Sequence, residues 1–136
     1  MKNPITLAYY SHGILSYNSD KEKQEYNFLK TKVEGHIICP NHHIGKLENP
    51  RNYQNIIKKV DCVFVSENEG FIGKGSYREC AAALEKNIPI FVIRNKNNKL
   101  ELERLTELVQ VSEYNLFNFG QLISKKIGKK NNYFND

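Results

Sequence analysis

The stretch DCVFVSENEGFIGKGSYRECAAALEKNIPIFVI, residues 61–93, decides the fold class of this 136-residue chain. Residues 62–65 and 89–93 are short, continuous apolar runs, which predict two buried β-strands. Between them, a glycine-rich polar loop at 66–74 precedes an alanine-rich segment at 75–87, which predicts a helix. Strand, helix and strand in this order indicate parallel strands that are buried on both faces.

The residues before this stretch continue the alternation of strands and helices. Ser19 and Glu22 have the spacing of a capping box, in which Ser19 caps a helix and Glu22 reaches back to it. Pro50 is suited to the first turn of a later helix. In chain order we expect a strand at 5–10, a helix at 19–32, a strand at 36–39, a loop at 41–49 and a helix at 50–60.

The residues after this stretch complete one domain. We expect a polar turn at 95–99, a fifth strand at 108–111 and a last helix at 118–126. The predicted fold class is α/β, a doubly wound, three-layer parallel sheet of five strands with the flavodoxin-like order 2-1-3-4-5. The single domain spans residues 1–136 and ends in a basic tail at 124–136.

Composition and charge exclude several function classes. The formal net charge is +5, but the charge is close to neutral without four lysines of the tail, Lys125, Lys126, Lys129 and Lys130. Such a tail is typical of a solvated end, so we do not expect a nucleic-acid partner. No apolar run has the ~18–20 residues of a membrane helix, and the N-terminus is too quickly polar for a signal peptide. We therefore expect a cytoplasmic protein with no membrane partner.

The cysteines and histidines give no metal-binding pattern. Cys39, Cys62 and Cys80 are odd in number, far apart and flanked by apolar residues, which predicts buried, reduced thiols. Such thiols are typical of a reducing compartment. His42 and His43 are adjacent, with no cysteine pair spaced to join them. We therefore expect no metal and no cofactor.

The predicted strand order places a crevice at the carboxyl ends of the first and third strands. The loops that face it, 10–18 and 66–74, contain glycines and hydroxyl groups. Glu79 follows near the start of the next helix, where the helix dipole stabilises a carboxylate. The site hypothesis therefore centres on Glu79, and an ordinary acid at a helix start is the alternative interpretation.

The same residues resemble the nucleoside 2-deoxyribosyltransferase family, which includes nucleotide N-glycosidases. In that family an acid opens the third strand, and the pattern Gly-small-x-x-Glu opens an alanine-rich helix. Asp61 matches the acid here, and Gly75, Ser76 and Glu79 match the pattern. The resemblance covers residues 5–93. It implies that Glu79 is a nucleophile and that Asp61 is a second acid that holds the sugar or assists the leaving base.

The resemblance also implies a tyrosine from the first strand that orients the nucleophile. Tyr9 and Tyr10 are both candidates, and strand alternation places one of them on each face of the sheet. Members of such families are usually homo-oligomers in which a neighbouring chain completes the pocket. By this resemblance we expect a homodimer or a higher homo-oligomer, with 117–120 as an interface segment.

One departure from the family pattern indicates a phosphorylated substrate. Enzymes of the family that act on free nucleosides have an Asp six residues before the Glu, where this chain has Gly73. The related nucleoside 5′-monophosphate N-glycosidases also lack that Asp and bind a phosphate with small or basic residues. The candidate phosphate-binding residues are Ser11, His12, Gly13, Gly73, Lys74, Gly75, Ser76 and Arg78. We therefore expect N-glycosidic bond cleavage or deoxyribosyl transfer on a nucleotide.

Three other interpretations stay open. The fold also occurs in non-catalytic modules that sense or sequester nucleotides. The run from Val65 to Leu84 is more distantly similar to TIR-like domains, some of which cleave NAD, although its spacing differs from theirs. A partner-binding protein would use the aromatic residues near the C-terminus, Tyr114, Phe117, Phe119, Tyr133 and Phe134.

Overall fold

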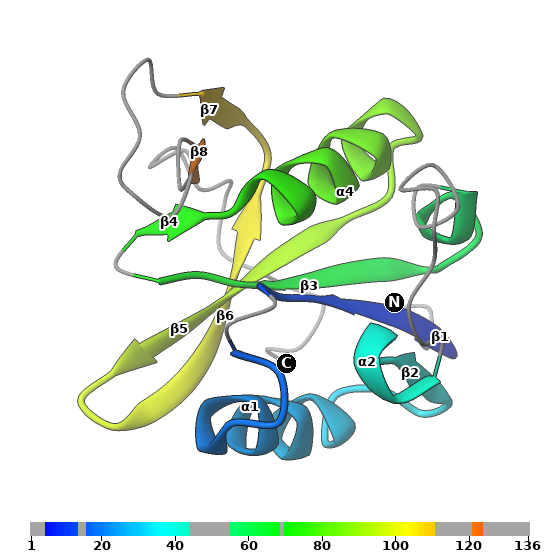
Figure 1. Cartoon of the computed structure of the whole chain (residues 1–136). Coiled ribbons are helices and arrows are strands. Elements are labelled where there is room, and N and C mark those ends of the chain that lie inside the picture. The colour runs from blue at the N-terminus through cyan, green and yellow to red at the C-terminus, as the bar shows by residue number, and fades with distance from the viewer. Residues whose placement is uncertain (1–4, 14–15, 44–54, 69, 111–120, 124–136) are drawn as a thin grey trace.

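A mixed sheet of five strands forms the centre of the molecule (Figure 1). The computed structural model describes residues 5–13, 16–43, 55–68, 70–110 and 121–123. The sheet has the order β2-β1-β3-β5-β6, which is the predicted order 2-1-3-4-5. Its strands are β1 (Leu7–Ser11), β2 (His36–Ile38), β3 (Cys62–Ser66), β5 (Ile90–Lys96) and β6 (Lys99–Leu105).

The prediction of a fully parallel sheet is wrong at the fifth strand. β1, β2, β3 and β5 pair in parallel, but β6 runs antiparallel to β5 in a hairpin that starts at the pair Lys96 and Lys99. Asn97 and Asn98 both have positive φ angles, 54° and 65°, which suits a two-residue hairpin turn. The predicted turn is therefore in the right place, but the chain returns at once as the fifth strand.

A second, smaller sheet contains the strand that we expected at 108–111. It has the order β4-β8-β7, with β4 at Phe71–Ile72, β7 at Leu108–Gln110 and β8 at Gln121–Ile123. Both of its pairings are antiparallel. The predicted last helix is wrong at Gln121–Ile123, which form a strand, and the rest of 118–126 lies outside the described residues.

The helices agree with the sequence prediction in part. α1 spans Asp20–Lys30, and the Ser19 hydroxyl caps it by accepting from the Glu22 amide at 3.1 Å. α4 spans Lys74–Glu85 with Gly73 as N-cap. Residues 55–57 are helical as expected, and the predicted start at Pro50 lies outside the described residues. α2 (Pro40–His43) is a short helix where we predicted a loop.

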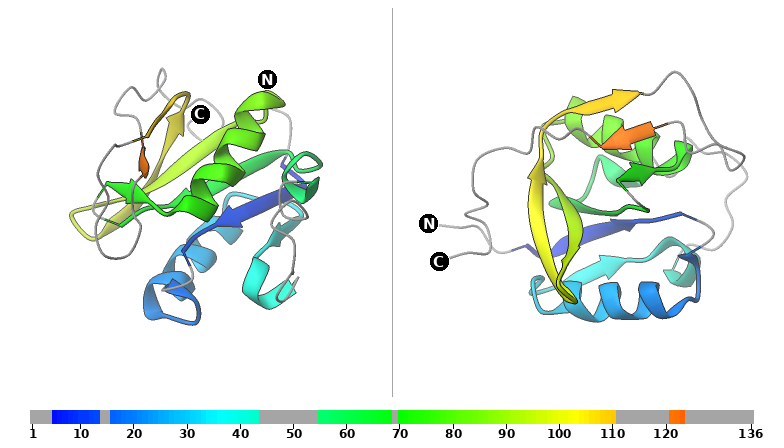
Figure 2. Two further views of the ribbon diagram at one scale, coloured as in Figure 1. Left: turned by 45° about the horizontal axis from the view of Figure 1, so that its top comes forward. Right: turned by 90° about the vertical axis from the view of Figure 1, so that its left-hand side faces the viewer.

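Two apolar cores lie on opposite faces of the central sheet (Figures 1 and 2). On the α4 face, Tyr9, Val63 and Val92 pack with Cys80 and Ala83 of the helix. The α1 face has its own set of buried residues, which includes Tyr10, Leu29, Phe64 and Phe91. Full burial of each large apolar side chain contributes roughly 1.5–3 kcal/mol. Burial on both faces thus stabilises the central strands of the sheet.

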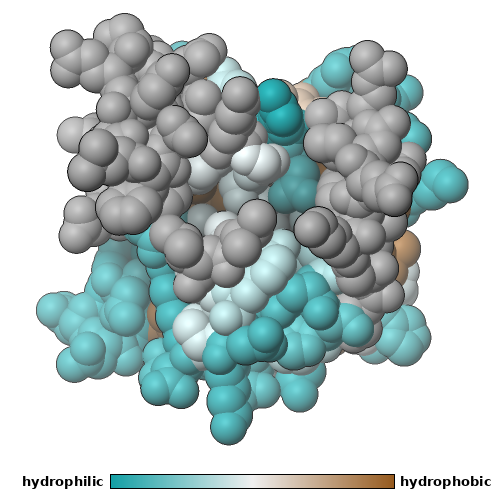
Figure 3. All heavy atoms as spheres, viewed as in Figure 1, coloured by the Kyte–Doolittle hydropathy of each residue, from teal (hydrophilic) through white to brown (hydrophobic). Residues whose placement is uncertain are grey.

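The three cysteines are buried, as predicted: Cys39, Cys62 and Cys80. No helix in the described ranges is both long and apolar enough to cross a bilayer. Hydrophilic side chains cover most of the described surface in the view of Figure 3.

Gly35 is expected to be essential for the pairing of β1 with β2. A Cβ atom at Gly35 would lie 1.9 Å from the backbone oxygen of Thr6, so the backbone would have to move. We expect Gly35→Ala to lower the free energy of unfolding by about 1–3 kcal/mol, the usual cost of overpacking, as measured by urea denaturation. Gly75→Ala is the matched control, because its Cβ would meet no atom within 4 Å. Equal stability of the two variants would contradict this prediction.

Candidate functional site

The carboxylate of Glu79 is held at the end of β1 by two hydroxyl groups. The Tyr9 hydroxyl donates to Glu79 Oε2 at 2.5 Å, and the Ser11 hydroxyl donates to Glu79 Oε1 at 2.7 Å. Tyr9 and Ser11 are two residues apart on one strand, so both side chains point to the face that α4 covers. Both carboxylate oxygens are thereby fixed from the same strand.

Burial dominates the electrostatics of Glu79. It raises the pKa of this carboxyl group above its ordinary value, and the hydrogen bonds from Tyr9 and Ser11 lower the pKa only in part. α4 begins at Lys74, so Glu79 is in its second turn. The helix dipole falls off within the first turn. The two hydroxyl groups therefore stabilise the anion more directly than the helix start that we expected to do so.

Tyr10 and His12 do not belong to the Glu79 site. They point to the opposite face of the sheet, where the Tyr10 hydroxyl donates to Glu25 Oε1 at 2.6 Å. The His12 ring stacks on the Tyr10 ring, with centroids 4.0 Å apart, and its side chain is fully buried. Of the two candidate tyrosines, Tyr9 is the one beside Glu79. His12 lies on the opposite face of the sheet, so it is no longer a candidate phosphate ligand.

Asp61 is also separated from Glu79. It precedes β3, and its Oδ2 accepts hydrogen bonds from the Thr6 amide, the Thr6 hydroxyl and the Leu7 amide. These hydrogen bonds, first that of the Thr6 amide, lower the pKa of Asp61. A strand rises about 3.3 Å per residue, so roughly 16 Å of strand separates Asp61 from Ser66 at the carboxyl end. Its place indicates a structural role at the start of β1 and does not fit the expected second acid.

The glycine-rich segment begins α4 beside the Glu79 site. Gly73 is the N-cap and has no side-chain hydrogen bond to the first turn, so backbone amides there have no capping side chain. Lys74 is the first residue of the helix, and Ser76 is buried. Gly75 and Arg78 are exposed. Gly13 follows β1 and is half-buried.

Another acid of this segment, Glu67, is paired with a basic residue. Glu67, directly after β3, accepts a hydrogen bond from Arg94 at 2.5 Å and does not replace the family acid that is missing at Gly73. The expected interface segment at 117–120 and the C-terminal aromatic residues lie outside the described residues.

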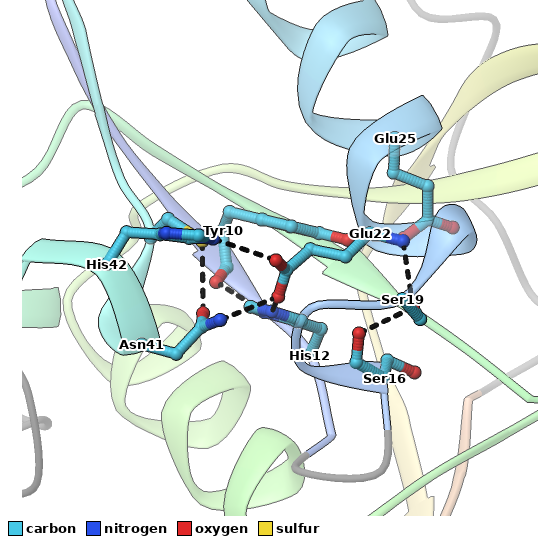
Figure 4. Close-up of polar contacts among 9 residues, drawn as sticks. Tyr10, His12, Ser16, Ser19, Glu22, Glu25, Asn41 and His42 are labelled. Carbon is cyan, nitrogen blue, oxygen red and sulfur yellow. Dashed lines mark hydrogen bonds and ion pairs between the residues drawn. The ribbon is translucent and has the colours of Figure 1, made fainter.

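Sequence reasoning missed a second polar cluster, around Glu22 (Figure 4). Instead of reaching back to Ser19, the Glu22 carboxylate contacts His12 Nε2 at 2.6 Å and His42 Nε2 at 2.8 Å. Asn41 Nδ2 donates to Glu22 Oε2 at 2.9 Å. Burial raises the pKa of Glu22, but the hydrogen bonds from His42, His12 and Asn41 outweigh burial and lower it. Since these residues come from α1, α2 and the loop after β1, no local spacing indicates that they meet.

Comparisons of this chain with protein-family models, with curated proteins and with solved structures find no match. The functional argument therefore depends on the geometry of these two polar clusters.

The Glu79→Gln variant is expected to show that the buried, ionised carboxylate of Glu79 destabilises the folded state. The pKa of Glu79 is higher in the folded than in the unfolded chain, so wild-type stability falls as the pH rises from the unfolded value of 4.5 through the folded one. Glutamine does not ionise, so Glu79→Gln should gain stability relative to wild type over this range. The gain is about 1.4 kcal/mol for each pH unit that separates the folded pKa from the unfolded one. Urea denaturation at about pH 4 and at about pH 8 measures the difference.

Glu85→Gln provides the matched control, because Glu85 is an exposed acid on the same helix. Because an exposed side chain contributes little to stability, Glu85→Gln should stay within about 0.5 kcal/mol of wild type at both pH values. A Glu79→Gln variant that behaves like this control would show that burial of Glu79 does not disfavour its charge.

Proposed function

We propose that this protein cleaves the N-glycosidic bond of a nucleotide, with Glu79 as the catalytic residue. The observation that supports this proposal is the Glu79 carboxylate, whose two oxygens accept hydrogen bonds from Tyr9 and Ser11 at the carboxyl end of β1. In the flavodoxin-like, doubly wound fold that we propose for the chain, ligands bind at this end of the strands.

The proposed chemistry uses the carboxylate as a nucleophile. One Glu79 oxygen bonds to the anomeric carbon while the bond to the base nitrogen breaks. The electron pair of that bond goes to the leaving base, which takes a proton from solvent. The transition state has positive charge on the sugar, which an adjacent carboxylate stabilises. Attack on the glycosyl ester by water releases the sugar and frees the carboxylate, whereas attack by a second base completes a transfer. Tyr9 and Ser11 are positioning residues.

A phosphorylated substrate is favoured by the start of α4. Its first-turn amides have no capping side chain, and such amides bind anions well. The sequence has two basic residues in this part of the helix, Lys74 and Arg78. We propose that a 5′-phosphate or a diphosphate lies here while the anomeric carbon faces Glu79.

A nucleotide-binding module without catalysis is the second candidate. Asp61, the expected second acid, is bound to Thr6 and Leu7 at the other end of the strands. The family acid at position 73 is replaced by glycine. A site without these two acids would still bind a nucleotide, so binding and cleavage have to be measured separately.

The Glu79→Gln variant is expected to lose base release. We would incubate the full chain with nucleoside monophosphates, deoxynucleosides and NAD, and follow the released base by chromatography. Glu79→Gln should lower the rate by at least about 10³-fold, because the amide is not a nucleophile. Tyr9→Phe should lower kcat by about 10–100-fold through loss of orientation, with a smaller effect on KM.

Glu85→Gln serves again as the control and should keep the wild-type rate. Nucleotide binding without release of base from any substrate would overturn the catalytic proposal and support the binding module. Release from NAD alone would favour the TIR-like activity.

The Ser11→Ala variant is expected to move the pH dependence of the reaction. Glu79 must be ionised to act, so the rate should rise with pH as its carboxyl group loses the proton. Since the Ser11 hydrogen bond lowers the pKa of Glu79, its loss should shift this acidic limb to higher pH. Thr31→Ala, which removes a hydroxyl at the end of α1, should leave the limb in place. An unshifted limb in Ser11→Ala would contradict the positioning role.

A further inference from the structure

The cluster around Glu22 brings together three kinds of metal-binding side chain. His12 follows β1, Glu22 is in the first turn of α1, and Cys39 follows β2. One ligand atom from each residue, a ring nitrogen, a carboxylate oxygen and a sulfur, lies within 4.8 Å of the other two. All three residues are buried. The cluster lies on the α1 face of the sheet, whereas Glu79 is on the α4 face (Figure 4).

The His12 ring is oriented as in a metal ligand. Its Nδ1 lies 3.2 Å from the backbone oxygen of Tyr10, an atom that only accepts hydrogen bonds. Nδ1 is thus placed to donate to this oxygen, and Nε2 points to Glu22 Oε2. A hydrogen bond from the second ring nitrogen to a backbone carbonyl is the usual support of a metal-bound histidine. The stacked Tyr10 ring, 4° from parallel, holds the imidazole in this orientation.

A second histidine contacts the Glu22 carboxylate from outside this group of three. His42 Nε2 contacts Glu22 Oε1 at 2.8 Å, and about half of the His42 side chain is exposed. A cleft of about 430 Å³, lined by Glu22, His42 and four further residues, leads to this side of the cluster. An ion from solvent would therefore meet Glu22 and His42 first.

We propose that His12, Glu22 and Cys39, with His42 as fourth ligand, bind one zinc-class divalent transition-metal ion. A sulfur, two imidazole nitrogens and a carboxylate oxygen suit tetrahedral Zn²⁺, and do not suit Mg²⁺ or Ca²⁺, which prefer oxygen ligands alone.

Binding replaces hydrogen bonds by metal–ligand bonds. In a tetrahedral zinc site the ligand atoms are roughly 3.3–3.6 Å apart, so the contact between His12 and Glu22 has to lengthen by about 1 Å. The Cys39 thiol proton, and any proton on His12 Nε2, leave to solvent when the metal binds. Burial raises the pKa of Cys39 to about 12, which keeps the thiol protonated without a metal. Asn41 Nδ2, which donates to Glu22 Oε2, would then support that ligand from outside, whereas Asn41 Oδ1 would lose the hydrogen bond that it accepts from the Cys39 thiol.

The experiment uses the reduced, full-length chain and the metal ions alone. Titration with Co²⁺ should saturate at one equivalent, with the visible bands of a tetrahedral ion and a near-ultraviolet band from thiolate to cobalt. Zn²⁺ should displace the cobalt and should raise Tm, because it binds the folded state. A wild-type cobalt spectrum without the thiolate band would overturn the proposal. The cluster would then be a hydrogen-bonded network and not a metal site.

Variants separate this site from adventitious binding. Cys39→Ser and His12→Gln should each weaken zinc affinity by at least about tenfold in competition with a chelator, and Cys39→Ser should abolish the thiolate band. His36→Gln and Cys62→Ser are the matched controls, an exposed histidine and a buried thiol outside the cluster, and should bind as wild type does. Circular dichroism without metal checks that each variant folds. Unchanged zinc affinity in folded Cys39→Ser would refute the site.

Discussion

The alternation of side chains along β1 is the constraint on which both polar clusters depend. β1 is buried between β2 and β3, so its odd-numbered and even-numbered side chains point to opposite faces. Tyr9 and Ser11 reach Glu79 of α4 on one face. Tyr10 contacts Glu25, and His12 contacts Glu22, on the α1 face. A shift of one residue in the register of β1 would exchange the two sets and would disrupt both clusters.

The two acids differ because their partners differ. Glu79 accepts hydrogen bonds from two neutral hydroxyl groups, which do not compensate for its burial, and its pKa is raised. Glu22 has two imidazoles and an amide as partners, and its pKa is lowered. An acid whose charge is disfavoured suits chemistry at its carboxylate. An acid whose charge is stabilised beside other metal-binding side chains suits a cation. The two acids of this fold therefore support two separate proposals, catalysis at Glu79 and metal binding at Glu22.

The sequence predicted the elements whose signals are local. Continuous apolar runs indicated β1, β3 and β5, and Ser19 indicated the start of α1. The resemblance pointed to Glu79 as the central acid of one cluster. The sequence did not reveal β6, although Leu100 and Leu102 alternate with Glu101 and Glu103 there, because the left-handed Asn97 and Asn98 had to be recognised as a hairpin turn. Asp61 lies at the start of the third strand, as the resemblance implied, but the role of second acid does not fit there, because Glu79 is held at the other end of β1.

By itself, the sequence determined where β1, β3 and β5 lie, that the three thiols are buried and that Tyr9 and Tyr10 point to opposite faces, because apolar runs and side-chain periodicity act over a few residues. Only the tertiary structure decided which tyrosine lies beside Glu79, and only it brought His12, Glu22 and Cys39 together. Those contacts join residues that are between 10 and 70 positions apart. No local pattern encodes such contacts, because they depend on how the buried strands align.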